Sequence, residues 1–326
     1  MPQAKEQSMS KALPLGELQA SSDLLQNLIA CAQSLAPVTI AVVHPCDAVS
    51  LSSALEAARL GLIKPVLVAP RGRIESVAAT EKLDISGIPI IDVPHSHAAA
   101  ARAAELAAQG EVQAIMKGSL HTDELMSAIL PSSANLRTKR RVSHCFLMQV
   151  PTYPRPFIIT DAAINIAPDL MAKADIVRNA IELAQVLGVV QPKVALLAAV
   201  ETVSPHMQAT LDAAVLCKMA DRGQIEGGLL DGPLAFDNAI SAEAANIKGI
   251  KSAVAGLADI LVAPDLESAN MLAKQLEYLG NASSAGIVLG AKVPVVLTSR
   301  ADPQASRLAS CAVAVILADH YRESPP

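Results

Sequence analysis

Short apolar segments alternate with longer amphipathic segments along most of the chain. Apolar residues recur at helical spacing over residues 24–35, Pro37 ends that helix, and the run VTIAVV at 38–43 is typical of a buried strand. The alternation continues to residue 116. It predicts helices near 49–60, 75–82 and 97–108, and strands near 65–68, 88–91 and 112–116.

The second half of the chain repeats this alternation after a basic stretch at 135–141. Residues 142–150 and 157–160 predict two neighbouring strands joined by a proline-rich turn, whereas residues 227–239 predict a loop. Strands that alternate with helices indicate an α/β fold with largely parallel sheets covered by helices on both faces. The other predicted elements are helices near 168–187, 207–222, 266–278 and 304–318, and strands near 193–199, 260–263, 287–289 and 295–298.

The length of 326 residues favours two domains rather than one. The alternation of apolar and amphipathic segments is interrupted before Ser143, and we expect the last forty residues to belong to the same domain as the first part of the chain. We therefore expect a discontinuous first α/β domain, residues 1–142 and 286–326, and a second α/β domain, residues 143–285.

Composition and charge narrow the possible partners. The formal net charge is −5, aromatic residues make up 2% and Trp is absent, so neither phosphate-backbone attraction nor base stacking is favoured. No apolar run approaches the ~20 residues that span a bilayer, and residues 1–15 contain no continuous apolar core. Five scattered cysteines without a CxxC pair are typical of reduced thiols. We expect a cytoplasmic protein that binds neither nucleic acid nor membranes.

Several familiar motifs are missing from the sequence. It contains no GxxxxGK[ST] loop, no GxGxxG fingerprint and no GxSxG elbow, which argues against a P-loop ATPase, a standard dinucleotide site and an α/β-hydrolase. His95 and His97 are two residues apart and would point in different directions on a helix. We therefore predict no metal site.

A first polar segment, KGSLHTD at residues 117–123, directly follows the predicted strand 112–116. Gly118 permits close backbone approach, Lys117 offers a positive charge, and Thr122 or Asp123 can cap the next helix. The alternative is a capped turn with a solvated lysine.

A second segment is basic. Arg137, Arg140 and Arg141 lie within five residues, and Ser143 and His144 begin the strand that follows. Clustered guanidinium groups bind dianions such as phosphate through bidentate hydrogen bonds. The alternative is an exposed basic loop.

Two further segments carry carboxylates. Asp231, Gly232 and Asp237 flank Phe236 in the predicted loop, which is either a shaped site or an ordinary turn.

The sequence TSRAD at 298–302 ends a predicted strand before the last helix. There the hydroxyl of Ser299 and the charge of Arg300, with backbone N–H groups, could meet a developing oxyanion, whereas Asp302 could simply cap the helix.

These four segments, in this order, resemble the signature segments of the phosphate acetyltransferase and phosphate butyryltransferase family over about residues 25–318. The resemblance implies an isopropylmalate-dehydrogenase-like fold with two α/β domains. It also implies a homodimer or higher homo-oligomer, and no metal in the chemistry. The matching residues are Lys117, Gly118, His121, Thr122, Arg137, Arg140, Arg141, Ser143, His144, Asp231, Gly232, Asp237, Ser299, Arg300 and Asp302.

The same resemblance implies a reaction and roles for residues. A short acyl group would move reversibly between coenzyme A and inorganic phosphate by direct attack in a ternary complex, with coenzyme A as a substrate and no other cofactor. Ser299 matches the active-site serine of the family and Arg300 the arginine beside it. The resemblance leaves the base open, and our own hypothesis is that Asp302 or Asp237 takes the thiol proton in the reverse direction. The remaining matched residues would bind phosphate or coenzyme A.

The chain departs from the acetyl type at several positions. The acetyl type usually has glycine after Ser-Arg and, further along, an acidic residue thought to act as the base toward the thiol. This chain has Ala301 and Asp302 after Arg300, and the later position falls near Ser306. An arginine of the acetyl type is also replaced near Met126, and Pro233 stands in place of a glutamate after Asp231-Gly232. These departures are shared with the butyryl type, so we expect a chain closer to that type. Two alternatives remain open: a metal- and NAD-dependent dehydrogenase on the same fold, and a non-catalytic protein that binds coenzyme A or acyl phosphate.

Overall fold

A computed structural model of the chain describes residues 23–299 and 301–326, so the amino-terminal stretch considered above and Arg300 lie outside the described residues. Contacts divide the chain into two compact units. The discontinuous unit comprises Leu25–Val142 and Ala285–Pro326, and the internal unit comprises Ser143–Ser284 with Leu24. Whether these units are independently folding domains with the boundaries predicted above stays a prediction.

The discontinuous unit contains a mostly parallel sheet with the strand order β3-β2-β1-β4-β11-β10. The neighbouring pairs from β3 to β11 are parallel, and β10 runs antiparallel to β11. The predicted alternation of apolar runs is therefore confirmed here. The strands are β1 (Val38–Val43), β2 (Ile63–Ala69), β3 (Ile90–Asp92), β4 (Ala114–Lys117), β10 (Ser283–Leu289) and β11 (Val295–Val296).

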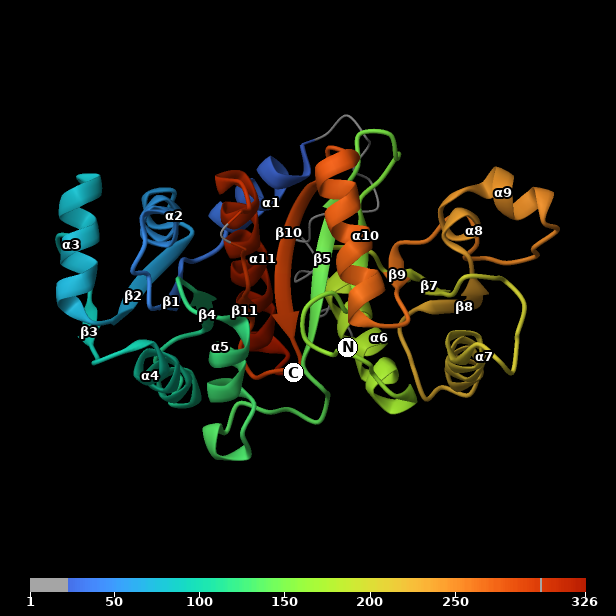
Figure 1. Ribbon diagram of the computed structural model, residues 1–326, viewed down its shortest axis with the longest axis horizontal. Helices are drawn as coiled ribbons and strands as arrows, with labels where there is room; N and C mark the ends of the chain where they lie inside the picture. The colour runs from blue at the N-terminus through green and yellow to red at the C-terminus, as the bar shows by residue number, and fades with distance from the viewer. Residues whose placement is uncertain (1–22, 300) are drawn as a thin grey trace, which may run out of the picture. The chain divides into compact units, whose positions relative to one another are not determined.

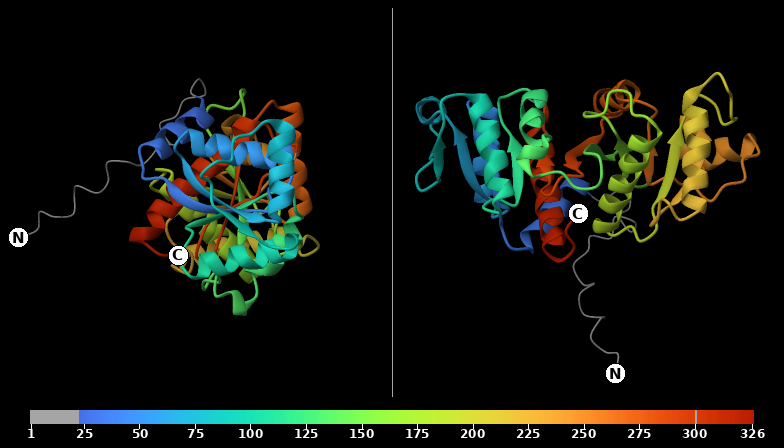
Figure 2. Two further views of the ribbon diagram at one scale, coloured as in Figure 1. Left: turned by 90° about the vertical axis from the view of Figure 1, so that its left-hand side faces the viewer. Right: turned by 90° about the horizontal axis from the view of Figure 1, so that it is seen from below.

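Helices cover both faces of this sheet. On one face α2 contacts both α3 and α11, and on the other α4 contacts α5. In Figure 1, α2 lies above the strands β1 and β2, and α4 and α5 lie below them. Seen from below, α4 and α5 lie side by side (Figure 2). The helices are α1 (Leu24–Gln33), α2 (Ala48–Arg59), α3 (Arg71–Glu81), α4 (Ser96–Ala108), α5 (Thr122–Ile129), the 3₁₀ turn η2 (Ser132–Ala134) and α11 (Gln304–Glu323).

The internal unit has its own strand order, β5-β6-β9-β7-β8. β5 and β6 form the predicted neighbouring pair and are antiparallel, whereas β6, β9, β7 and β8 are parallel. Buried aromatic side chains of β5 and β6, Phe146 and Phe157, join the apolar core of this unit. The strands are β5 (Ser143–Gln149), β6 (Phe157–Thr160), β7 (Lys193–Leu197), β8 (Leu229–Leu234) and β9 (Ile260–Val262).

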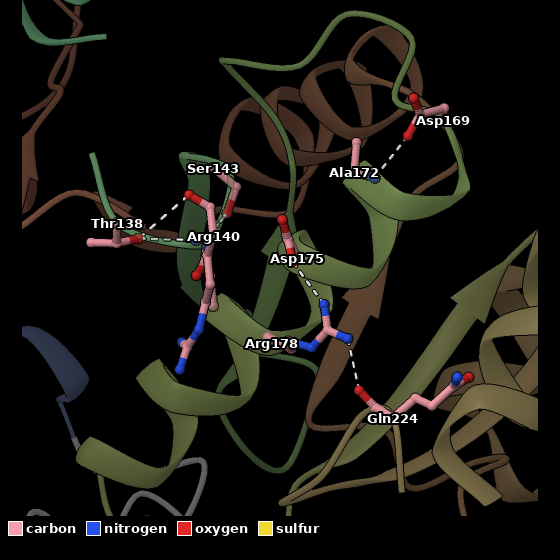
Figure 3. Close-up of polar contacts among 9 residues, drawn as sticks. Thr138, Arg140, Ser143, Asp169, Ala172, Asp175, Arg178 and Gln224 are labelled. Atoms are coloured by element: carbon pink, nitrogen blue, oxygen red, sulfur yellow. Dashed lines mark hydrogen bonds and ion pairs between the residues drawn. The ribbon is translucent and has the colours of Figure 1, made fainter. Parts of the chain in front are cut away.

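Its helices are also divided between two faces. In Figure 1, α7 lies below β7 and β8, and α8 and α9 lie above them. The side chain of Asp169 caps α6 by accepting from the Ala172 N–H at 2.8 Å, and Arg178 joins Asp175 to the carbonyl of Gln224 (Figure 3). The helices are α6 (Leu170–Val186), α7 (Gln208–Asp221), α8 (Phe236–Ile240), α9 (Ala242–Ile247) and α10 (Leu266–Leu279).

One sequence prediction is wrong in this unit. Residues 227–239 were expected to form a loop, but Leu229–Leu234 form β8 and Phe236–Ile240 form α8. Gly232 and Pro233 obscure the strand because both residues are rare inside sheets. β8 lies at an end of the strand order, where a proline is tolerated because only one side of the strand must pair.

Within residues 23–299 and 301–326, no helix combines the length and the apolar character that crossing a membrane requires.

Candidate functional site

The carboxyl ends of β1, β4 and β11 bring two of the predicted segments to one edge of the discontinuous unit. β1 pairs with β4 so that Val43 lies opposite Lys117, and β11 pairs with β4 so that Val296 lies opposite Met116. All three strands are parallel. The Lys117 segment and the Ser299 segment therefore leave neighbouring strands at the same edge, which is where α/β folds place their ligands.

The segment after β4 forms a tight turn whose lysine is turned inward. Lys117 is 8% exposed, and its Nζ donates to the carbonyls of Gly118 at 3.3 Å and Leu120 at 3.0 Å. A Cβ at Gly118 would lie 2.4 Å from the Val43 carbonyl oxygen, so only glycine fits this position. The predicted cap is wrong: His121 occupies the cap position of α5, and Thr122 and Asp123 lie in its first turn.

A histidine that the sequence analysis missed supports this turn. The hydroxyl of Ser119 donates to the His44 carbonyl at 2.8 Å and lies 3.2 Å from His44 Nδ1, while Arg73 lies 3.5 Å from His44 Nε2. Burial, followed by the charge of Arg73, lowers the pKa of His44 below its ordinary value. His44 is therefore neutral at pH 7. Its place directly after a predicted strand was the available signal.

The segment after β11 closes on itself through its own side chains. Asp302 Oδ2 accepts from the Ser299 N–H at 2.7 Å, and Ser299 Oγ accepts from the Ala301 N–H at 3.3 Å. The Asp302 N–H donates to the Ser299 carbonyl at 3.2 Å. These contacts define the serine turn, whose described residues are Ser299, Ala301 and Asp302. Asp302 therefore caps this turn, whereas α11 begins later, at Gln304.

The serine turn leaves the hydroxyl proton of Ser299 as its donor toward a ligand. Ser299 is exposed, and its N–H and that of Ala301 already have acceptors within the turn. The backbone donors proposed for an oxyanion at these two residues are thus engaged. Arg300, predicted to act beside Ser299, lies outside the described residues. Arg307, which sequence reasoning missed, donates to the carbonyls of Ser299 and Asp302.

The basic segment is held at a different place in the same unit. Thr138 Oγ1 donates to the Gly290 carbonyl at 2.8 Å and accepts from the Arg140 N–H at 3.1 Å, as Figure 3 shows for the second contact. An isolated bridge pairs Arg137 with Ala291. Residues 290–294 connect β10 to the start of β11, so the backbone of Arg137 lies at the amino end of β11. Ser299 follows its carboxyl end.

Ser143 and His144 open β5 in the internal unit and are both buried. The hydroxyl of Ser143 accepts from Asn179 Nδ2 at 2.8 Å. His144 is 1% exposed, and its ring packs edge-on against Phe146 with centroids 4.4 Å apart. Burial, with the charge of Lys274, lowers the pKa of His144 to about 3. The imidazole is neutral at pH 7, and its part in phosphate binding stays a prediction.

The third predicted segment also belongs to the internal unit. Asp231 Oδ1 accepts from the Gly232 N–H at 2.8 Å, and a Cβ at Gly232 would lie 2.7 Å from the Leu196 carbonyl oxygen. Asp237 forms an ion pair with Lys248 at 3.2 Å. Desolvation raises the pKa of Asp237, but hydrogen bonds from Lys248 and the backbone outweigh it and lower the pKa below its ordinary value.

In the part of the chain that the structure describes, no three His, Cys, Asp or Glu side chains gather as a metal site requires.

Comparison with known proteins identifies the family. The model of the phosphate acetyl/butaryl transferase family matches residues 93–315. The phosphate acetyltransferase of Rhizobium meliloti is 59% identical over 295 residues, which cover 90% of this chain and 93% of that protein. The phosphate butyryltransferase of Clostridium acetobutylicum is 39% identical over 279 residues, covering 86% of this chain and 93% of the relative.

A solved structure agrees with these relatives. The branched-chain phosphotransacylase from Enterococcus faecalis V583 has a TM-score of 0.75 and 31% identity, and the match covers 86% of this chain and 99% of that one.

The expectation of a chain closer to the butyryl type is corrected by these identities. The relative named an acetyltransferase is 59% identical and the relative named a butyryltransferase is 39% identical, although the residues around Ala301 and Pro233 suggested the opposite. The predicted type rested on a few motif positions, whereas the identities are taken over most of the chain. The dehydrogenase alternative has no support among these relatives. The chain therefore belongs to the phosphate acetyl/butyryl transferase family and is a phosphate acyltransferase.

Proposed function

We propose that the protein transfers an acetyl group reversibly between coenzyme A and inorganic phosphate, by direct attack in a ternary complex. Coenzyme A is a substrate, and no other cofactor takes part. The serine turn is the observation that carries the proposal, because it presents an exposed hydroxyl whose oxygen is already fixed by the Ala301 N–H. The choice of acetyl rests on the 59% identical relative that bears that name.

The steps follow from acyl-transfer chemistry. A phosphate oxygen attacks the thioester carbonyl carbon, a tetrahedral oxyanion forms, and the C–S bond breaks to release the thiolate, which takes up a proton. The hydroxyl of Ser299 donates to the oxyanion in this scheme. Loss of one such donor commonly slows the chemical step by about 10²–10³-fold.

Phosphate is held, in this proposal, by Arg140 and Arg141. The bridge of Arg137 lies at the amino end of β11, but that strand is only two residues long, so the long arginine side chains can extend toward Ser299. Charge-assisted bidentate hydrogen bonds suit a guanidinium and a dianion, and Arg141 is exposed. Lys117 supports the site by closing its turn rather than by reaching outward. The other substrate-binding residues named from the sequence stay predictions.

Asp302 is the better candidate for the base that takes the thiol proton in the reverse direction. It belongs to the same turn as Ser299. Asp237 is engaged by Lys248, which lies 3.3 Å from Glu201 as well, and its lowered pKa makes it a weaker proton acceptor.

Assembly and location form a further part of the proposal. Met271, Tyr278 and Leu279 leave large apolar surfaces exposed on α10, which supports a homodimer or higher homo-oligomer. In the described residues none of the five cysteines forms a disulfide, which supports a cytoplasmic location. Light scattering of the purified chain measures the first point.

Replacement of Ser299 by alanine tests the chemistry. Phosphate-dependent release of the thiol from acetyl-CoA is followed with a thiol reagent, with butyryl-CoA as a second substrate and NAD reduction as a third assay. We expect S299A to lower kcat about 10²-fold or more while the KM for acetyl-CoA stays near that of the wild type.

The matched control is S76A, which removes an exposed serine hydroxyl from α3 and should keep the wild-type rate. A wild-type rate in S299A would remove the proposed role of its hydroxyl. If the wild type turned over butyryl-CoA faster than acetyl-CoA, the transferred group in this proposal would be butyryl and not acetyl.

A further inference from the structure

Arg307 occupies an unusual position for a cation. It lies in the first turn of α11 and is 3% exposed, among buried neighbours such as Ser306 and Leu308. The amino end of a helix carries partial positive charge, and a buried charge loses its hydration. Both effects disfavour an arginine here, so the contacts of its guanidinium must compensate.

Those contacts go to the two ends of the serine turn. Arg307 Nη2 donates to the Ser299 carbonyl at 2.5 Å, and Nε donates to the Asp302 carbonyl at 3.2 Å. The planar guanidinium offers donors in a fixed geometry, so it sets the distance between the two carbonyls that it joins. The Ser299 carbonyl also accepts from the Asp302 N–H, which completes a small network.

Nearby charges offset part of the burial. Burial lowers the pKa of Arg307 below its ordinary value, and the charges of Asp302 and Asp47 oppose that effect. Asp47 is the residue that caps α2, where its side chain accepts from the Ser50 N–H. Charges of the serine turn and of the start of α2 therefore both act on the guanidinium.

A cavity of about 220 Å³ lies against the same side chain. Arg307 is one of its lining residues, so we expect a small solute in the cavity to contact the space left by a truncated Arg307 side chain. The residues that line it are Ala48, Val49, Ser52, Ser53, Glu81, Leu83, Asp302, Gln304 and Arg307.

We propose that Arg307 is a positioning residue: by joining the carbonyls of Ser299 and Asp302 it fixes the direction of the Ser299 hydroxyl toward the reacting carbonyl. The inference rests on the proposed function and adds a residue that acts through Ser299. A displacement of about 1 Å at a reacting group can cost about 10²-fold in rate. The direction of the hydroxyl, and not substrate affinity, is what Arg307 supplies.

The first experiment compares R307A, R307K and R322A. Arg322 also lies on α11 but is exposed and paired with Asp319, so R322A controls for loss of a cation from the same helix. We expect R307A to lower kcat for acetyl transfer about 10²-fold with KM for acetyl-CoA and phosphate within about threefold of wild type. R307K keeps the positive charge but lacks the planar guanidinium that donates to two carbonyls at once, and we expect its kcat to fall about tenfold.

Chemical rescue separates positioning from folding. Added guanidinium should raise the kcat of R307A at least tenfold, by entering through the cavity. It should leave the kcat of the wild type and of R322A unchanged. Urea should restore nothing, because it is uncharged. Should R307A not fold, R307K carries the test through its kcat alone.

A double variant tests whether the two residues act as a unit. If Arg307 works through Ser299, S299A/R307A should be no slower than S299A within about threefold, because the hydroxyl that Arg307 directs is already absent. Multiplicative losses would overturn the inference, as would a wild-type kcat in folded R307A or R307K. A wild type that releases no thiol with phosphate would instead overturn the proposed function.

Discussion

Two turns, one in each unit, use the same chemistry in opposite ways. The serine turn follows β11, and a turn at Asp161–Asn165 follows β6. In both, a carboxylate accepts backbone N–H groups: Asp302 from Ser299, and Asp161 from Ala163 at 3.0 Å and Ile164 at 3.1 Å. Their surroundings differ.

The Asp161 turn is satisfied from within. Its carboxylate is 3% exposed and also accepts from the N–H of Asn165 at 3.1 Å and from Nδ2 of Asn165 at 2.6 Å. The serine turn is exposed and depends on Arg307, a side chain of the next helix. A closed network suits a structural role. The serine turn is instead fixed through its backbone carbonyls by Arg307, which leaves the Ser299 hydroxyl available for chemistry.

The sharpest test of this contrast is D161A. It removes the acceptor of three backbone N–H groups in a buried turn, and each unsatisfied donor costs about 1–3 kcal/mol. We expect the free energy of unfolding to fall by about 3–5 kcal/mol in urea titrations. A loss below about 1 kcal/mol would contradict the structural role.

The matching change in the serine turn is D302N. The amide oxygen can still accept from the Ser299 N–H, so we expect urea stability to stay within about 1 kcal/mol of wild type. The amide cannot take a proton, so kcat for acetyl transfer should fall about 10²-fold, or about 2.7 kcal/mol, in both directions. Activity near that of the wild type would limit Asp302 to holding the turn.

A smaller effect concerns the pH dependence of stability and depends on a buried histidine of the internal unit. The pKa of His144 is about 3 in the folded state, because of burial and Lys274, against an ordinary value of 6.5. Below pH 6.5 the unfolded chain therefore binds a proton at His144 that the folded chain does not. The free energy of unfolding consequently decreases as the pH is lowered. Between pH 7 and pH 5 this contributes about 2 kcal/mol of lost unfolding free energy.

The variant H144Q should lack this part of the pH dependence. Its stability is compared with that of the wild type by urea titration at both pH values. Equal losses in the two proteins would show that His144 already titrates normally in the folded state.

The parts of the fold that were predictable are those with a local signal. Buried strands such as β1 follow from unbroken apolar runs, and the segment after β4 was recognisable because Lys117 and Gly118 follow such a run directly. β8 was missed because Gly232 and Pro233 carry the opposite local preference.

The rest of the site depends on pairing between distant segments. In the sequence Arg307 is one of several polar residues at a helix start, and only the positions of the Ser299 and Asp302 carbonyls give it partners. Likewise, the bridge between Arg137 and Ala291 decides which end of β11 the basic segment meets. Burial of His144 follows from the packing of its whole unit. None of these features has a signature within a few residues of sequence.

The proline of β8 has a consequence for the protein in a crowded solution. A strand at the end of a sheet exposes N–H and C=O groups to which a strand of another molecule can add. Pro233 removes one backbone N–H donor from β8, and the neighbouring Gly232 lowers the strand propensity of this edge strand. This margin is therefore a poor template for edge-to-edge aggregation, even though the sheet behind it is rich in aliphatic side chains.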